Sequence, residues 1–335
     1  YVTISMTNCK TRVEITKTLE KLSGEPESGL GQLSPENPAV FEILDQNGAV
    51  KAVITVEKEG EVYTAEGLDP GVYTLHEAKA PAGYAAAPDR TFEVTDRMDP
   101  ENPAEPLPVR LDLENDLTET VISKISIADQ KELSGARLQV LDETGAVAVT
   151  VFGEKLEWIS GTEPKVIKGL EAGTYTLRET SAPDGYLVAQ EIEFVLNSDG
   201  TTTVNQQDAA EIVMVDDVTK VTVSKQDFAT GEELSGARLV LRDAQGNTIA
   251  DWITDGKPKE FYGELIAGET YTLTEIYAPE GYEVTETVTF QVAEDGEIQR
   301  VVMQDKRTEE DGQITVRKFI KYEGEYVALT YTFYT

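Results

Sequence analysis

The sequence contains three sets of side chains that could do chemistry in a buried site, each made of a lysine amine, a glutamate carboxyl and an asparagine or aspartate. Within each set the three residues lie in separate runs of alternating apolar residues, and alternate residues of a strand share one face. We therefore expect them on apolar strand faces, where a charged group is costly unless it has a task. The sets are Lys17, Glu77 and Asn115; Lys124, Glu179 and Asp216; and Lys225, Glu275 and Asp305.

Burial changes the protonation states of an amine and a carboxyl group. An exposed lysine is protonated at neutral pH and cannot attack, whereas burial disfavours its charge and releases the neutral, nucleophilic amine. Burial also raises the pKa of a glutamate, which then stays protonated and can hydrogen-bond a carbonyl on which charge develops. Folding supplies the alignment, with effective molarities of about 10⁵ M or more. The alternative is a buried Lys–Glu salt bridge beside a polar neighbour, which is costly to bury.

Each glutamate lies in a block with the pattern Tyr-Thr-Leu-x-Glu-x-x-Ala-Pro-x-Gly-Tyr. The three copies are YTLHEAKAPAGY at Tyr73–Tyr84, YTLRETSAPDGY at Tyr175–Tyr186 and YTLTEIYAPEGY at Tyr271–Tyr282. A block that recurs roughly every hundred residues indicates a tandem array of one small module. The chain is long enough for three complete modules, each with its own core.

The lysine opens each module and the asparagine or aspartate closes it. Each lysine follows apolar residues at steps of two, as Ile15 precedes Lys17, and three of the four methionines lie two residues before a closing residue. Asp217, beside Asp216, leaves a one-residue ambiguity in the second set, and strand parity with Met214 favours Asp216. The spacing from a closing residue to the next lysine is nine residues from Asn8 to Lys17, from Asn115 to Lys124 and from Asp216 to Lys225.

The pattern of the whole chain is all-β. Short runs rich in β-branched and aromatic residues alternate with turn clusters such as Asp142–Gly145 and Asn197–Gly200. Several such strands in each module predict an immunoglobulin-like sandwich of two antiparallel sheets. No segment has a sustained helical period, and Asn205–Ala210 is the one place with room for a short helical turn.

The repeats divide the chain into five segments. Thr3–Asn8 resembles Glu211–Asp216, which predicts that the chain opens with the last strand of a preceding repeat. Gln313–Lys318 resembles Thr120–Lys124, which predicts that the chain stops within a following repeat. The predicted segments are 1–8, the last strand of a preceding repeat; 9–117, 118–218 and 219–308, three complete repeats; and 309–335, the first strands of a truncated repeat.

Composition excludes several classes of function. A net charge of −33 and an isoelectric point near 4.3 argue against nucleic-acid binding and favour a soluble, self-repelling surface. No Asp-x-Asp-x-Asp-Gly calcium loop is present. Cys9 is the only cysteine and His76 the only histidine, so a disulfide within the chain, a zinc cluster and a repeated His- or Cys-based catalytic centre are excluded. We expect no metal and no cofactor.

With its glutamate block, its opening lysine and its closing asparagine or aspartate, the module resembles the domains of a known family. The glutamate block resembles the E-box of pilins, and almost the whole chain resembles the CnaB-type (SpaA-like, prealbumin-like) repeat domains of Gram-positive surface adhesins and pilins. The resemblance implies an inverse immunoglobulin-like sandwich in which lysine and asparagine or aspartate join spontaneously as an isopeptide bond, with the glutamate as catalyst. The implied bonds are Lys17–Asn115 with Glu77, Lys124–Asp216 with Glu179, and Lys225–Asp305 with Glu275.

This sequence departs from the pattern of the family in two respects. Asp216 and Asp305 stand where asparagine is the commoner acceptor. Asn8 and Lys318 match the acceptor and nucleophile positions but lack partners in this sequence, so we expect both to stay unreacted. The chemistry is used once by each domain, and we do not expect a turnover enzyme.

These features predict a structural stalk of a bacterial cell-surface adhesin or pilus-like protein. A bond between the first and last strands would carry tension covalently, in a chain without disulfides. The absence of a signal peptide and of an apolar run long enough to span a membrane predicts the middle of a larger exported, cell-wall-anchored protein. The expected partners are neighbouring repeats and a host surface or matrix ligand bound by a distal domain, with no nucleic acid.

Two other functions remain open. The repeats themselves could bind a host matrix or carbohydrate ligand through the long loops Gly24–Asn37 and Asp99–Pro108, although these carry few aromatic or arginine anchors. A pilus shaft subunit polymerised by a sortase is the third possibility. It predicts a pilin lysine motif and a C-terminal sorting signal, and neither is visible.

Overall fold

The computed structural model describes residues 11–22, 31–102, 105–285, 287–308, 313–322 and 325–334. These residues form β-strands, turns and loops without a helix, so within them no helix is long and apolar enough to cross a membrane. The all-β fold predicted from the sequence is confirmed. The chain divides into two compact units, one of Tyr1–Pro183 with Val188–Asp217 and one of Asp184–Leu187 with Val218–Thr335.

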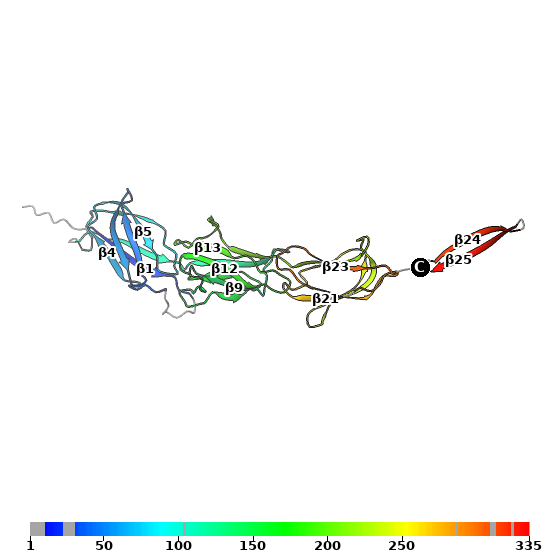
Figure 1. The fold of residues 1–335 in the computed structure, drawn as a ribbon. Coiled ribbons are helices and arrows are strands. Elements are labelled where there is room, and N and C mark those ends of the chain that lie inside the picture. Colours follow the sequence, from blue (N-terminus) through cyan, green and yellow to red (C-terminus); the bar gives the residue numbers. More distant parts are fainter. Residues whose placement is uncertain are drawn as a thin grey trace, which may run out of the picture. The chain divides into compact units, whose positions relative to one another are not determined.

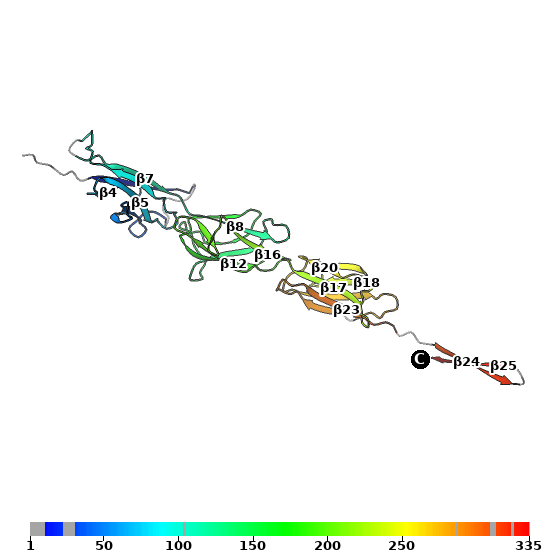
Figure 2. The same cartoon turned by 90° about the horizontal axis from the view of Figure 1, so that it is seen from above.

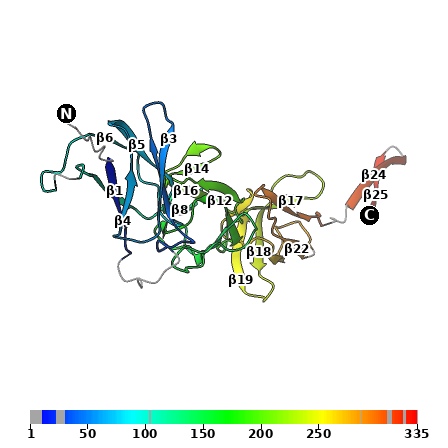
Figure 3. The same cartoon turned by 90° about the vertical axis from the view of Figure 1, so that its left-hand side faces the viewer.

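The first sandwich, β1–β7, lies in the first unit. Its three-stranded sheet has the order β4-β1-β7 and its four-stranded sheet the order β3-β2-β5-β6. β1 pairs with β4 antiparallel and with β7 parallel, so the first and last strands are neighbours; Figure 3 shows β1 beside β4. The strands are β1 (Arg12–Leu19), β2 (Ala39–Leu44), β3 (Val50–Val56), β4 (Val62–Glu66), β5 (Gly71–Lys79), β6 (Arg90–Val94) and β7 (Val109–Asn115).

The second sandwich, β8–β16, lies in the same unit and repeats this plan. Its sheets have the orders β11-β8-β16 and β10-β9-β12-β13-β14-β15, and β8 pairs with β16 parallel. Figure 1 shows β9, β12 and β13 in green. The strands are β8 (Glu119–Ser126), β9 (Arg137–Leu141), β10 (Glu157–Ile159), β11 (Lys165–Lys168), β12 (Gly173–Ser181), β13 (Ile192–Leu196), β14 (Thr202–Val204), β15 (Gln207–Asp208) and β16 (Ile212–Asp216).

The second unit contains the third sandwich, β17–β23, and a separate hairpin. The sheets of this sandwich have the orders β20-β17-β23 and β19-β18-β21-β22, again with the first and last strands parallel; Figure 2 shows β17, β20 and β23 together. The strands are β17 (Lys220–Asp227), β18 (Ser235–Arg242), β19 (Thr248–Asp255), β20 (Lys259–Tyr262), β21 (Thr270–Tyr277), β22 (Val288–Gln291) and β23 (Gln299–Asp305), followed by the hairpin of β24 (Gln313–Tyr322) and β25 (Glu325–Tyr334).

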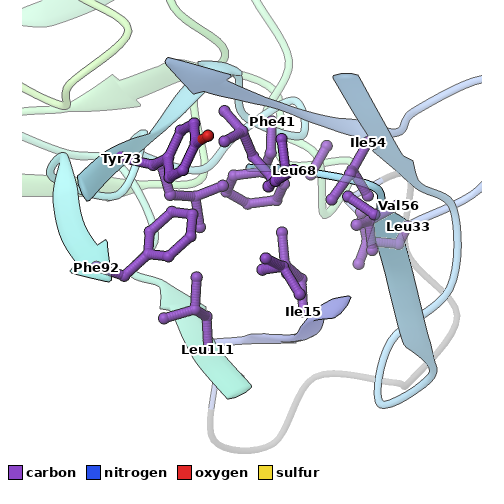
Figure 4. Packing of buried hydrophobic residues seen from close by; sticks show 14 of the residues in the cluster. Ile15, Leu33, Phe41, Ile54, Val56, Leu68, Tyr73, Phe92 and Leu111 are labelled. Carbon is purple, nitrogen blue, oxygen red and sulfur yellow. The ribbon is translucent and has the colours of Figure 1, made fainter. Parts of the chain in front are cut away.

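Each sandwich has its own apolar core between its two sheets, because alternate residues of every strand face inward. In the first core, Ile15 and Leu111 from the three-stranded sheet point toward Phe41, Tyr73 and Phe92 of the facing sheet (Figure 4). The tyrosine that opens each glutamate block stacks on a phenylalanine of the next strand. The ring centroids are 5.9 Å apart for Tyr73–Phe92, 5.6 Å for Tyr175–Phe194 and 6.1 Å for Tyr271–Phe290.

Turn chemistry corrects one sequence-based prediction. The segment Asn205–Ala210 contains no helical turn, because Asn205 and Gln206 both have positive φ, 52° and 63°, and join β14 to β15 as a two-residue hairpin loop. Asparagine tolerates this left-handed region, whereas a helix requires negative φ. Asn197–Gly200 forms the predicted hairpin turn between β13 and β14, with Gly200 at φ 83°.

Truncation of a core aromatic should affect one sandwich alone. Phe194 is buried in the second core, and we expect Phe194→Ala to lower the free energy of unfolding of that sandwich by about 3–5 kcal/mol. Hydrogen exchange followed by mass spectrometry measures each sandwich separately. The third sandwich should keep its protection because its core is separate. Phe319→Ala, at an exposed position, is the control; an equal loss in both sandwiches would contradict independent cores.

Candidate functional site

The predicted lysine, glutamate and asparagine or aspartate are buried in the core of every sandwich. The lysine comes from the first strand and the acceptor from the parallel last strand, in whose register Lys124 lies opposite Met214 and Lys225 opposite Met303. The acceptor two residues further on therefore projects from the same face. The glutamate reaches them from the facing sheet, on β5, β12 or β21. All nine side chains are buried: Lys17, Glu77, Asn115, Lys124, Glu179, Asp216, Lys225, Glu275 and Asp305.

In the second and third sandwiches the lysine amine lies between two carboxyl groups. Lys124 Nζ is 3.1 Å from Glu179 Oε2 and donates a hydrogen bond to Asp216 Oδ1. In the third sandwich Lys225 Nζ is 2.9 Å from Glu275 Oε1 and donates to Asp305 Oδ1. The amine therefore contacts both the catalyst predicted by the sequence and the predicted acceptor.

The first site is arranged differently. Asn115 Nδ2 donates hydrogen bonds to Glu77 Oε2, at 2.8 Å, and to the carbonyl oxygen of Ala85. Lys17 Nζ is buried without a hydrogen-bond partner among the described residues and lies 5.9 Å from the ring centroid of Phe41. The amine is thus desolvated and free of a direct ion pair, while the glutamate holds the acceptor amide.

The loop that follows each glutamate block folds back onto the glutamate. A backbone N–H ten residues further along donates to the carboxylate: Ala87 to Glu77 Oε2 at 2.6 Å, Ala189 to Glu179 Oε2 at 2.6 Å, and Thr285 to Glu275 Oε2 at 2.8 Å. The block's glycine has positive φ in all three copies, which reverses the chain there. The block therefore supplies the acid and the chain reversal, and the loop that follows it orients the acid.

In the second and third sandwiches the backbone of the buried lysine is also held, by residues that the sequence-based prediction did not include. Glu132 Oε2 accepts the Lys124 N–H at 3.3 Å, and the Leu133 N–H donates to the Lys124 carbonyl at 2.6 Å. The third sandwich repeats this with Glu233 and Leu234 on Lys225, at 3.2 and 2.7 Å. The signal was present in the sequence, because the segment Leu-Ser-Gly-Ala-Arg-Leu after each of these glutamates recurs unchanged.

Burial shifts the protonation equilibria in the direction that acyl transfer to an amine needs. Desolvation lowers the pKa of Lys17 to about 8, against the opposing charge of Glu77, and raises the pKa of Glu77 itself. Desolvation likewise raises the pKa of Asp216 to about 7 and that of Asp305 to about 6, although each accepts a hydrogen bond from its lysine. Neutral forms of Lys17, Asp216 and Asp305 are therefore accessible near neutral pH.

The structure also locates the other positions named from the sequence. Asp216, not its neighbour Asp217, is the fully buried residue in contact with Lys124, as strand parity predicted. Asn8 and Cys9 lie outside the described residues. Lys318 is exposed on β24. Among the residues that the structure describes, no group of three His, Cys, Asp or Glu side chains could hold a metal ion.

A family model agrees with this architecture. The model of the SpaA prealbumin-like fold domain matches residues 36–103, 118–210 and 219–307. The chain belongs to this SpaA family. The resemblance drawn from the sequence is thereby confirmed at the level of family and fold. The third matched segment contains a complete site, with Lys225, Glu275 and Asp305.

Solved structures of similar proteins include pilins. The Bacillus anthracis TIE protein is 25% identical, with 89% of this chain and 51% of that one covered, at a TM-score of 0.37. The major pilin BcpA of Bacillus cereus is 16% identical, with 89% and 100% covered and a TM-score of 0.30. The full-length major pilin SpaD of Corynebacterium diphtheriae is 13% identical, with 90% and 98% covered and a TM-score of 0.33. No curated protein matches the chain.

The buried amine of the first site should make stability depend on pH once its acceptor is removed. In Asn115→Ala, native Lys17 has a pKa of about 8 against an ordinary value of 10.5 in the unfolded chain. Between these pH values the unfolded state binds the extra proton, so the free energy of unfolding of the first sandwich should rise as pH rises from 8 to 10.5.

Denaturant unfolding of Asn115→Ala across this pH range measures the effect. The double variant Lys17→Met with Asn115→Ala lacks the titrating amine and should show no such rise. Parallel curves for the two variants would show that Lys17 keeps its ordinary pKa.

Proposed function

We propose that each of the three SpaA-type repeats closes its own sandwich with an intramolecular isopeptide bond, and that the array is a structural stalk of a bacterial surface adhesin or pilus-like protein. The bonds are Lys17–Asn115, Lys124–Asp216 and Lys225–Asp305. The observation that carries the proposal is the recurrence of one arrangement: a buried lysine on the first strand, its acceptor on the adjoining last strand and a buried glutamate from the facing sheet.

The reaction is an acyl transfer from the acceptor side chain to the lysine. The neutral amine attacks Cγ of the asparagine or aspartate, and an N–C bond forms as a C–N or C–O bond breaks. The protonated glutamate hydrogen-bonds the carbonyl oxygen as charge develops there and relays a proton from the amine to the leaving group. Asn115 releases ammonia, while Asp216 and Asp305, reacting as neutral acids, each release water. The glutamate ends as it began, and each site reacts once.

The bond's position explains its mechanical use. Force applied to the ends of a repeat enters through the first strand and leaves through the last, and these two strands are parallel neighbours. Without the bond, tension would act on the hydrogen-bonded ladder between them. With it, tension passes from lysine to acceptor through a covalent bond. Closing the loop of 92 residues between Lys124 and Asp216 also stabilises the folded state by about 4–5 kcal/mol in the chain-entropy description.

The proposal places the protein outside the cell, anchored in the full-length protein to the cell wall, with the repeats at 9–117, 118–218 and 219–308. Its partners are the neighbouring repeats and a host surface or matrix ligand held by a distal domain. The tandem arrangement of the matched SpaA segments supports this assignment. A structural role also fits the chemistry, because each lysine and acceptor reacts only once and the glutamate stays buried, where no outside substrate reaches it.

Removing the glutamates one at a time should remove the bonds one at a time. In Glu77→Gln, Glu179→Gln and Glu275→Gln, the carboxyl proton that the reaction needs is lost while the side-chain volume is kept. Proteolytic peptide mapping after denaturation should then show the branched lysine–acceptor peptide missing from the altered repeat and present in the other two.

Glu193→Gln, on an exposed position of β13, is the matched control and should retain all three branched peptides. Branched peptides that persist in all three glutamine variants would show that the buried glutamates do not promote the bond.

Pulling on single molecules should distinguish bonded from unbonded repeats. In Glu179→Gln the segment of 92 residues between Lys124 and Asp216 is free to extend, which adds a step of roughly 300 Å. The parent protein and Glu193→Gln should lack this step because the bond bypasses the segment. A step of that length in the parent protein would contradict a load-carrying bond in the second repeat.

A further inference from the structure

The loop that follows the glutamate block of the first sandwich holds both the acceptor and the glutamate. The Ala85 carbonyl accepts a hydrogen bond from Asn115 Nδ2, and the Ala87 N–H donates to Glu77 Oε2 at 2.6 Å. The Ala85 N–H donates to the carbonyl of Asp116, one residue beyond the acceptor, at 2.9 Å. A shift of Ala85–Ala87 would therefore move the acceptor amide and the catalytic carboxyl together.

The other side of this loop contacts the second sandwich, which belongs to the same compact unit. The Ala86 N–H, between the two residues that hold the site, donates to the carbonyl of Ser198 at 2.7 Å. Gly200 lies against Ala85, and a Cβ placed on Gly200 would be 2.8 Å from the Cβ of Ala85. Ser198 and Gly200 both belong to the turn between β13 and β14.

Hydrogen bonds of the link between the two sandwiches hold this turn against the loop of the first sandwich. The Thr118 N–H donates to the Gly83 carbonyl of the first sandwich at 3.0 Å, and Thr118 Oγ1 donates to the Leu170 carbonyl of the second at 2.6 Å. The Gly169 N–H donates back to the Thr118 carbonyl at 3.0 Å. A Cβ on Gly83 would approach Val151 to 2.7 Å, so the two surfaces are in close contact there.

We propose that the β13–β14 turn of the second sandwich, Asn197–Gly200, is a positioning element for the isopeptide bond of the first. The turn touches no reacting atom. It fixes Ala85 and Ala86, and through Ala85–Ala87 it fixes Asn115 and Glu77. This inference rests on the proposed function. Its consequence is an order of events: the Lys17–Asn115 bond reaches its full rate only after the second repeat has folded and docked.

A single methyl group tests this inference. Gly200→Ala in the full chain brings its new Cβ against Ala85 and should slow the Lys17–Asn115 bond by about 10- to 100-fold, the effect expected when reacting groups are displaced by about an ångström. Gly145→Ala is the matched control. Gly145 also lies in a hairpin turn of the second sandwich with φ of 80°, against 83° for Gly200, but nothing lies within 4 Å of its added Cβ.

The measurement is a time course of cell-free synthesis, stopped by denaturation, in which peptide mapping quantifies the linked fraction of each repeat. Gly145→Ala should link the first repeat at the parent rate, and both variants should form Lys124–Asp216 equally fast, which shows that the second repeat folds. Adding Ala85→Gly to Gly200→Ala removes the colliding Cβ and should restore the first bond.

The possible outcomes distinguish failure of the positioning role from failure of the proposed isopeptide function. Equal rates of the first bond in Gly200→Ala and Gly145→Ala, or no recovery with Ala85→Gly, would overturn the positioning role. If Gly200→Ala also loses the Lys124–Asp216 bond, Ala85→Leu applies the same collision from the first repeat. The residue directly after the glutamate block is Ala85 in the first repeat and Leu187 in the second, so leucine already occurs at this position of the module. An unchanged rate of the first bond in Ala85→Leu would overturn the positioning role. Absence of all bonds from the parent protein would overturn the proposed function and this inference with it.

Discussion

The parallel pairing of the first and last strands is the constraint on which the rest of each sandwich depends. Two strands from opposite ends of a repeat become neighbours, and their register sets the lysine diagonally across from the acceptor on the buried face. A one-residue slip of this register would turn one of the two side chains to the other face of the sheet. The facing sheet then needs to contribute only one residue, the glutamate, to complete the site. The position of the site therefore follows from this one pairing together with the facing sheet.

Burial shifts the protonation equilibria of these side chains and also makes them costly. A lysine amine among apolar side chains loses the solvation that keeps it charged, and a carboxyl group there gains a reason to stay protonated. The three sites balance these effects differently. In the second and third sites two carboxyl groups contact the amine, whereas Lys17 makes no such ion pair among the described residues and lies over the ring of Phe41, and desolvation lowers its pKa to about 8. A covalent bond between lysine and acceptor would replace the charged groups with a neutral amide. The free-energy cost of burying those charges would then no longer apply.

Much of this arrangement could be predicted from the sequence because it is periodic. Alternation along single strands placed Lys124 and Asp216 on apolar faces, and parity with Met214 separated Asp216 from Asp217. Contacts that depend on backbone groups far apart in the chain had no such signature. The hydrogen bond from Ala86 to Ser198 requires the folded structure, since it joins two backbone groups and no side-chain pattern marks it. The glutamate eight residues after Lys124 recurs after Lys225, but its contact with the lysine backbone shows only in the folded structure. The helical turn expected after Asn205 failed for a local reason, two consecutive residues with positive φ.

The mass of the denatured, unmodified full chain tests the central claim most directly. Isopeptide bonds survive denaturation, whereas buried salt bridges do not, so the measurement separates the two interpretations of the same buried side chains. The account predicts a mass below that of the printed sequence by one ammonia, from Asn115, and two waters, from Asp216 and Asp305. A mass equal to that of the sequence would contradict it.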